Sequence, residues 1–187
     1  KIDFELLSRE FAHTRRKNLL LRDLDELVNQ QLSKMLFANP QRIDYYDRYQ
    51  EIIDAYNAEQ NRATIEKTFM DLMELASSLD TEQQRYVREG FSSDEELSVY
   101  DLLFSENLTK QEIETIKKVS VDLLTKIKQQ IAKLDHWTDK QETKAIVDNL
   151  IRNTLWQELP NSYDVSDIQT YQKKIYEYVY MRYPEVA

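Results

Sequence analysis

The sequence has no cysteine, only one glycine and only three prolines among its 187 residues. The lack of cysteine excludes disulfides and thiolate metal sites, and it fits the reducing cytoplasm, where we expect this protein. Sheet-rich folds need turn residues, and α/β folds need glycine where backbones approach closely. The scarcity of both residues therefore favours an all-α fold. A single glycine also cannot build a glycine-rich phosphate loop.

Long apolar runs and excess positive charge are missing as well. No run of about 18 apolar residues occurs, so we expect no membrane-spanning helix and no membrane partner, and no signal peptide is recognisable. The formal net charge is −9, and such a surface repels the phosphate backbone, which leaves room only for a local basic patch. The chain begins with lysine rather than methionine, so we expect it to be a fragment of a longer protein.

The spacing of apolar residues predicts a series of amphipathic helices. Helices are expected over 3–13 and 18–38, and the second must stop at Asn39-Pro40, because proline lacks an N–H and crowds the preceding turn. A third helix follows and ends near Asn57. A regular stripe of apolar residues from 65 to 79 marks the fourth.

Capping-box patterns predict where the later helices begin. Each pattern pairs a hydroxyl residue with Glu or Gln three positions later, and they start at Ser93, Thr109, Thr138 and Ser166. Gly90 is expected to end a helix over 81–89 in a left-handed conformation. About nine helices result, with no sheet, in an irregular array around one elongated core. We expect a single domain over 1–187. An alternative is that residues 1–60 form a looser N-terminal lobe of this domain.

A search for catalytic chemistry returns no candidates. His13 and His136 belong to no metal-ligand pair, so both are interpreted as structural or surface residues. No nucleophile-elbow motif is present, and the acidic run 94–96 is explained as first-turn charge at a helix N-terminus. We therefore predict no catalytic, cofactor-binding or metal-binding residue in this chain.

The densest basic cluster is Arg15, Arg16 and Lys17. One interpretation is a contact with DNA phosphates or with an acidic partner surface. The other is positive charge at the C-terminus of the first helix, which the helix dipole favours.

Tyrosines are concentrated in the last helix, where they cannot all share one face. Tyr171 and Tyr178 are expected on the core stripe, and Tyr176, Tyr180 and Tyr183 are expected to point elsewhere. Exposed tyrosines suit a protein interface, because they are large and rigid with a polar tip. The alternative is packing on a neighbouring lobe. The two tryptophans, Trp137 and Trp156, are interpreted as anchors in the core or between lobes.

An ordered series of short segments gives the chain a family resemblance. The series runs as follows: Leu7–Phe11, the Asn39-Pro40-Gln41-Arg42 break, Tyr49–Asn57, Glu95–Leu103 with Tyr100-Asp101, Trp137, Ile151–Leu155, Leu159-Pro160 and Tyr163. In this order the segments resemble the C-terminal helical region of the R subunit of type I restriction-modification enzymes. The resemblance covers nearly the whole chain.

The resemblance implies a parent subunit with a nuclease domain and two helicase-like motor domains, which use ATP and Mg²⁺ to translocate DNA before cutting it. It also implies that this region docks on the methyltransferase core of M and S subunits and contacts the motor domains of its own chain, with DNA reached through the parent. None of the family's Walker, helicase or nuclease motifs matches a position here, so the fragment itself should be inert.

Three hypotheses remain open. The first is an assembly domain that holds the endonuclease subunit on its M and S partners. The second is an accessory domain of the same subunit that guides DNA through a local basic stripe. The third disregards the resemblance and supposes a free-standing helical protein, either an interaction module or an enzyme with a pocket of ionisable side chains.

Overall fold

The computed structural model describes residues 3–184, so residues 1–2 and 185–187 of the predicted 1–187 domain lie outside the described residues. Within 3–184 the chain forms nine α-helices, one 3₁₀ turn and no strand, which confirms the all-α prediction. The elements are α1 (Phe4–His13), α2 (Lys17–Ala38), η1 (Pro40–Arg42), α3 (Ile43–Ala58), α4 (Arg62–Glu82), α5 (Arg85–Arg88), α6 (Asp94–Leu103), α7 (Lys110–Ile131), α8 (Gln141–Glu158) and α9 (Val165–Arg182).

The chain divides into two compact units, Lys1–Arg85 and Tyr86–Ala187. The buried apolar side chains form two clusters, one within each unit, in place of the one elongated core expected from the sequence. The first unit extends to Arg85 because the apolar stripe of α4 completes its core. The assignment of 1–187 as one domain of a longer protein stays a prediction.

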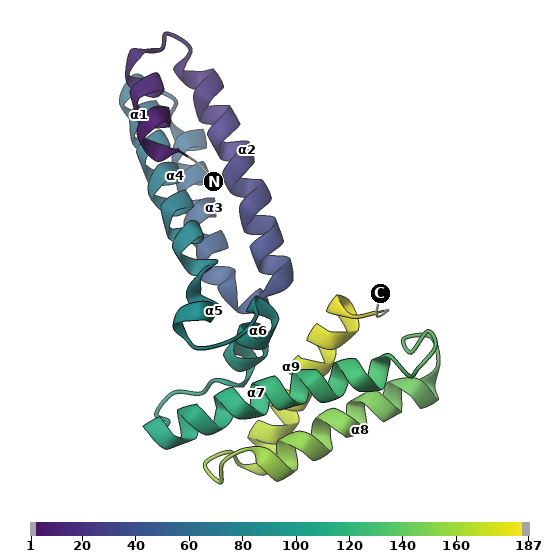
Figure 1. Cartoon of the computed structure of the whole chain (residues 1–187). Helices are drawn as coiled ribbons and strands as arrows, with labels where there is room; N and C mark the ends of the chain where they lie inside the picture. The colour runs from purple at the N-terminus through teal and green to yellow at the C-terminus, as the bar shows by residue number, and fades with distance from the viewer. Residues whose placement is uncertain (1–2, 185–187) are drawn as a thin grey trace. The chain divides into compact units, whose positions relative to one another are not determined.

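The first unit is built around α4, which packs against both α2 and α3 (Figure 1). Its stripe supplies Phe69, Leu72 and Leu79, each at most 1% exposed. On α1, Phe11 stacks on Phe69 with ring centroids 3.7 Å apart. The single apolar stripe recognised in the sequence is therefore the centre of this unit.

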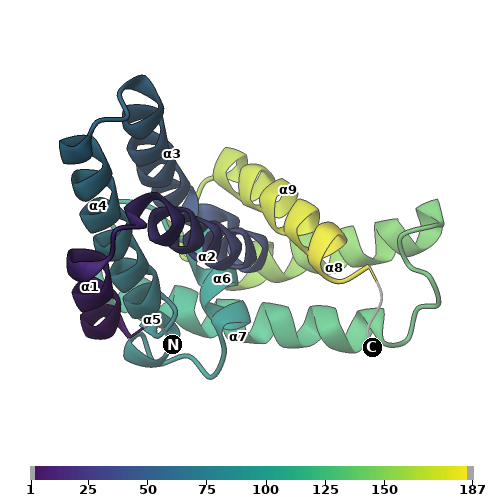
Figure 2. The same cartoon turned by 90° about the horizontal axis from the view of Figure 1, so that it is seen from above.

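The second unit is a hairpin of α7 and α8, completed by α9 against α8 and by α6 against α7 and α9 (Figure 2). Its core includes Leu97, Ile116 and Ile151 together with Trp137 from the α7–α8 connection, all fully buried. The prediction that Trp137 is a core anchor is confirmed.

Helix starts follow the predicted caps in two of four cases. The Ser93 hydroxyl accepts a bond from the backbone N–H of Glu96, and Thr109 forms a full capping box. Thr138 and Ser166 do not cap, because α8 begins two residues later and α9 two residues earlier than caps at those positions require. The caps there are Lys140, without a side-chain bond, and Asp164.

The helix predicted over 81–89 was wrong. In its place, α4 ends at Glu82 and the single turn of α5 follows. Gly90 does adopt a left-handed conformation, with φ +84, just after α5. The expected role of this glycine as the residue that ends a helical turn is therefore confirmed.

Candidate protein interface

Two of the predicted interface tyrosines lie together on the surface of α9. Tyr176 and Tyr180 are one turn apart, and their ring centroids are separated by 6.2 Å. Trp137 meets both rings edge-on, at 6.1 Å from Tyr176 and 5.7 Å from Tyr180. Tyr180 is 39% exposed and Tyr176 is half-buried. A fully buried indole thus holds two accessible phenol rings in fixed positions, which lowers the entropy lost on contact with a partner.

Tyr183 lies elsewhere, in the core. Its ring is 9% exposed and packs edge-on against Tyr178, and its carbonyl accepts a bond from Trp137 Nε1 at 2.6 Å. Burial raises the pKa of the Tyr183 phenol. Tyr183 does not follow the helical wheel on which it was placed, because α9 ends at Arg182 and the next backbone angles, φ −127 and ψ 54, turn the ring inward. Tyr171 packs against the core and Tyr178 is buried in it, as predicted.

A groove of about 450 Å³ runs between α8 and α9 beside these tyrosines. Tyr176, Lys144 and Lys173 line it together with Gln172 and Asp148. Gln172 Nε2 donates to Asp148 Oδ1 at 2.9 Å, which ties the two helices together across the groove.

The outer side of α8 exposes a second aromatic residue. Trp156 is 59% exposed, so it does not anchor the core, and an anchoring role between lobes stays a prediction. Trp156 lies on the side of α8 opposite the buried Val147 and Ile151. A helical wheel of α8 predicts that Trp156 is exposed, because residue 156 falls about half a turn away from the buried residues 147 and 151.

We call this surface the Trp156 face. Its exposed residues between positions 145 and 157 are Ala145, Ile146, Asn149, Arg152, Asn153, Trp156 and Gln157, and the exposed Glu142 lies on the same side in the first turn of the helix. Only one of the seven, Arg152, is charged, in a chain in which 32% of residues are charged. Protein interfaces are enriched in Trp and Arg and depleted in Lys, Glu and Asp, and the Trp156 face has that composition.

The basic cluster of the sequence is smaller on the folded surface. Arg15 and Arg16 are exposed between α1 and α2, but Lys17 donates to Glu66 at 2.8 Å and lies 4.9 Å from the ring centroid of Phe11. The hydrogen bond from Lys17 lowers the pKa of Glu66. The cluster follows the C-terminus of α1, where the helix dipole favours positive charge, but Arg16 and Lys17 also stand at the N-terminus of α2, where it is disfavoured.

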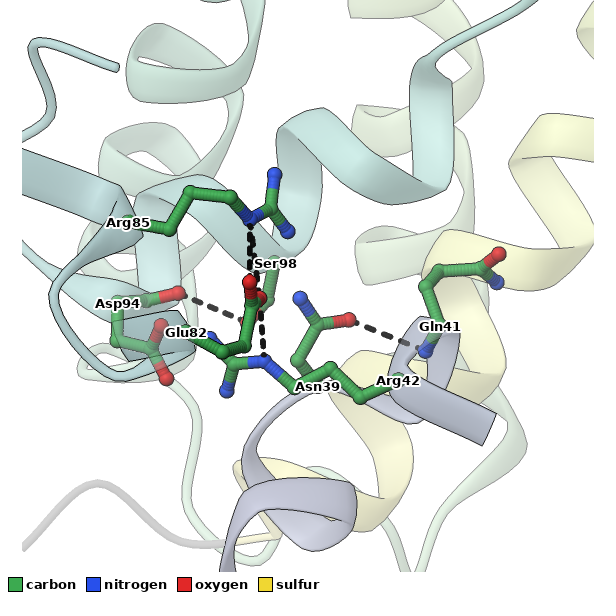
Figure 3. A network of polar contacts seen from close by, with 7 residues as sticks. All are labelled: Asn39, Gln41, Arg42, Glu82, Arg85, Asp94 and Ser98. Atoms are coloured by element: carbon green, nitrogen blue, oxygen red, sulfur yellow. Dashed lines mark hydrogen bonds and ion pairs between the residues drawn. The ribbon is translucent and has the colours of Figure 1, made fainter. Parts of the chain in front are cut away.

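The Asn-Pro-x-Arg break forms a buried polar cluster within the first unit (Figure 3). Asn39 Oδ1 accepts from the backbone N–H of Gln41 at 3.1 Å and so caps the 3₁₀ turn that Pro40 begins. Arg42 then enters the core, where its Nε lies 3.0 Å from Glu82 Oε1, and their side chains are only 3% and 8% exposed. This cluster holds the ends of α2 and α4 together and leaves no side chain presented for chemistry. Figure 3 also draws the hydrogen bond within α6 from Ser98 Oγ to the carbonyl of Asp94.

Arg85 binds the same carboxylate. Its Nε lies 2.9 Å and 3.0 Å from the two oxygens of Glu82. No sequence pattern predicts that Arg42 or Glu82 is buried, since isolated charged residues are normally found on the surface.

Residues 3–184 contain no group of three or more His, Asp or Glu side chains placed to hold a metal ion. His13 is the exposed last residue of α1, and the exposed His136 lies in the α7–α8 connection with φ 45. Residues 3–184 do not fit ATP or Mg²⁺, because they contain neither a glycine-rich phosphate loop nor a cluster of carboxylates placed to hold a metal ion. Burial disfavours the phenolate form of tyrosine, and it raises the pKa of Tyr49 to about 12 and also raises the pKa of Tyr163.

Every helix in the described part of the chain is too short or too polar to span a lipid bilayer.

Comparison with known proteins identifies the family. No curated protein and no solved structure matches the chain. One family model, the C-terminal region of type I restriction enzyme HindI endonuclease subunit-like proteins, matches residues 1–183. That range includes both units, the Asn39-Pro40 break and the α8–α9 surface. The chain therefore belongs to the family of C-terminal regions of type I restriction enzyme HindI endonuclease subunit-like proteins.

Proposed function

We propose that this chain is the assembly region of a type I restriction enzyme R subunit. It docks the ATP-dependent, DNA-translocating endonuclease subunit onto its methyltransferase and specificity partners, the M and S subunits, in the cytoplasm. The observation that carries the proposal is the Trp156 face, a helix surface with an exposed tryptophan and a single charge among seven residues. Recognition proceeds through side-chain contacts, and the chemistry with ATP, Mg²⁺ and DNA belongs to other parts of the subunit.

The size of the exposed indole supports a docking role. A tryptophan side chain buries up to about 250 Å². With 59% of Trp156 exposed, roughly 150 Å² remains for a partner to cover. At about 25 cal/mol per Å², covering it contributes roughly 3–4 kcal/mol, which is the size of an interface hot spot. Arg152 lies one turn away on the same side and supplies a planar group for hydrogen bonds.

The test uses the intact R subunit and a preformed M–S complex. Trp156→Ala is expected to raise the dissociation constant by about 30-fold, the equivalent of about 2 kcal/mol. Phe37→Ala is the matched control, because Phe37 is a similarly exposed aromatic residue, at 57%, in the first unit. An R subunit that lacks residues 1–187 and still co-purifies with M and S would refute the assembly function.

DNA guidance is the second candidate function. The observation in its favour is the pair of guanidinium groups on Arg15 and Arg16, which are exposed and form no ion pair within residues 3–184. Two charges give a weak phosphate site, and both units carry more acidic than basic residues. Protein docking is therefore the better supported function.

A further inference from the structure

The groove between α8 and α9 differs in chemistry from the Trp156 face. Two positively charged residues, Lys144 and Lys173, and one negatively charged residue, Asp148, line the groove. The side-chain amides of Gln141, Gln169 and Gln172 complete the polar lining. The groove is thus locally positive in a chain whose net charge is −9.

The single lining carboxylate is already engaged. Asp148 Oδ1 accepts from Gln172 Nε2 at 2.9 Å. Lys173 is 78% exposed, and the nearest oxygen of Glu177 is 4.0 Å from its Nζ, too far for a hydrogen bond. Lys144 forms no ion pair within the described residues. Its Nζ lies 5.8 Å from the centroid of the Tyr180 ring. Both ammonium groups therefore retain hydrogen-bonding capacity for an incoming anion.

The start of α8 adds to this positive field. Lys140 occupies the cap position and its side chain makes no capping bond. The Thr143 hydroxyl donates to the carbonyls of Trp137 and Lys140, so it does not satisfy the first amides of the helix either. Uncapped amides and the helix dipole favour negative charge at the end of the groove where Gln141 lies.

We infer that this groove binds an acidic segment of the protein partner, a helix or loop that presents Asp or Glu side chains to Lys144 and Lys173. The inference rests on the proposed assembly function and identifies the chemistry of the partner at that surface. The phenol of Tyr176 and the glutamine amides offer donors and acceptors that suit carboxylates and peptide groups. A short acidic segment needs only the ammonium groups of Lys144 and Lys173, whereas a long row of DNA phosphates would also meet the rest of a chain with a net charge of −9.

The groove is continuous with the Trp156 face. Ala145 both lines the groove and belongs to that face. A partner seated on α8 can therefore cover Trp156 with an apolar patch and place its acidic side chains in the groove. The apolar contact supplies affinity, and the charges select the partner and speed its encounter.

The experiment measures binding of the intact R subunit to the M–S complex over a series of salt concentrations. The double variant Lys144→Glu with Lys173→Glu is expected to bind about tenfold more weakly at low salt and to lose most of the salt dependence of the wild type. Lys110→Glu with Lys133→Glu is the matched control, since both lysines are exposed in the same unit outside the groove. This control should bind like the wild type.

The design separates the inference from the function on which it rests. If deletion of residues 1–187 abolishes binding while the groove variant binds normally, the groove inference is overturned and the assembly function stands. If the deletion leaves binding intact, both fail. A groove variant that loses affinity for duplex DNA and keeps its affinity for M–S also overturns the inference. Lys144→Gln with Lys173→Gln, which removes charge without reversing it, must show a smaller loss in the same direction. Equal thermal midpoints establish that both variants are folded.

Discussion

The buried ion pair at the Asn-Pro-x-Arg break allows a quantitative test of how the first unit is held together. We consider Arg42→Met, which keeps an unbranched apolar side chain as far as the position of Nε and removes the charged guanidinium group. The side chain of Glu82 is 8% exposed, so it loses one partner and cannot recover full hydration. Arg85 remains, with its Nε 2.9 Å and 3.0 Å from the two carboxylate oxygens.

The expected cost follows from that geometry. Removal of one partner from a buried pair costs about 3–5 kcal/mol. Because Arg85 still compensates Glu82, we expect the lower end, about 3 kcal/mol. With a urea m value of about 1.5 kcal/mol/M, the unfolding midpoint should fall by about 2 M. The double variant Arg42→Met with Glu82→Leu should recover most of this loss, since a well-packed apolar pair often matches a buried ion pair in stability.

Urea unfolding followed by far-UV circular dichroism measures these changes. Arg62→Met is the control, because Arg62 forms a similar ion pair with Glu66, at 3.2 Å, but its own side chain is 86% exposed. Exposed pairs contribute little, so the control midpoint should stay near that of the wild type. A loss for Arg42→Met as small as that of the control would refute the argument. So would a double variant that is less stable than Arg42→Met alone.

Three further predictions follow from individual contacts. Tyr49→Phe removes a hydroxyl that donates to Asp25 at 2.7 Å. Burial is the main cause that raises the pKa of Tyr49 to about 12, so the folded state keeps a proton that the unfolded state loses above pH 10. The stability advantage of the wild type should therefore be full below pH 10 and shrink as pH rises through 12, and urea titrations that show a constant difference would contradict this. Trp137→Phe leaves the carbonyl at the end of α9 without its 2.6 Å donor and should cost about 3 kcal/mol in the same assay, while a loss under about 1 kcal/mol would show that the bond contributes little. The double variant Arg15→Glu with Arg16→Glu should lower the affinity of the intact R subunit for duplex DNA and the steepness of its salt dependence if the DNA-guiding function is correct, and unchanged binding isotherms would exclude that function.

Much of the fold could be predicted because local patterns decide it. Apolar periodicity located α2 and α4 to within a few residues, and the proline at position 40 marked the break between α2 and α3. The caps at Ser93 and Thr109 were read correctly because each hydroxyl stands directly before an apolar stripe. At Thr138 the pattern was present but the chain was still completing the turn that buries Trp137, so tertiary packing overrode the local signal.

The candidate site was predicted less well, because exposure depends on which neighbours cover a helix. Tyr176 and Tyr180 were assigned to the surface from their place on the wheel of α9. Tyr183 was misplaced because it was assigned with the wheel of α9, although it lies one residue beyond the end of that helix at Arg182. Trp156 was interpreted as an anchor because tryptophan side chains are usually buried. The helical wheel of α8 predicts the exposed position that the structure shows.

The two tryptophans give the second unit a pair of optical reporters in opposite environments. Trp137 is fully buried, whereas Trp156 is 59% exposed. The emission of the first should be shielded from acrylamide until the unit unfolds, and the emission of the second should be quenched in the free protein. Loss of that quenching when a partner is added would report docking directly, without a label. The chain thus contains its own signal for folding and a separate signal for assembly.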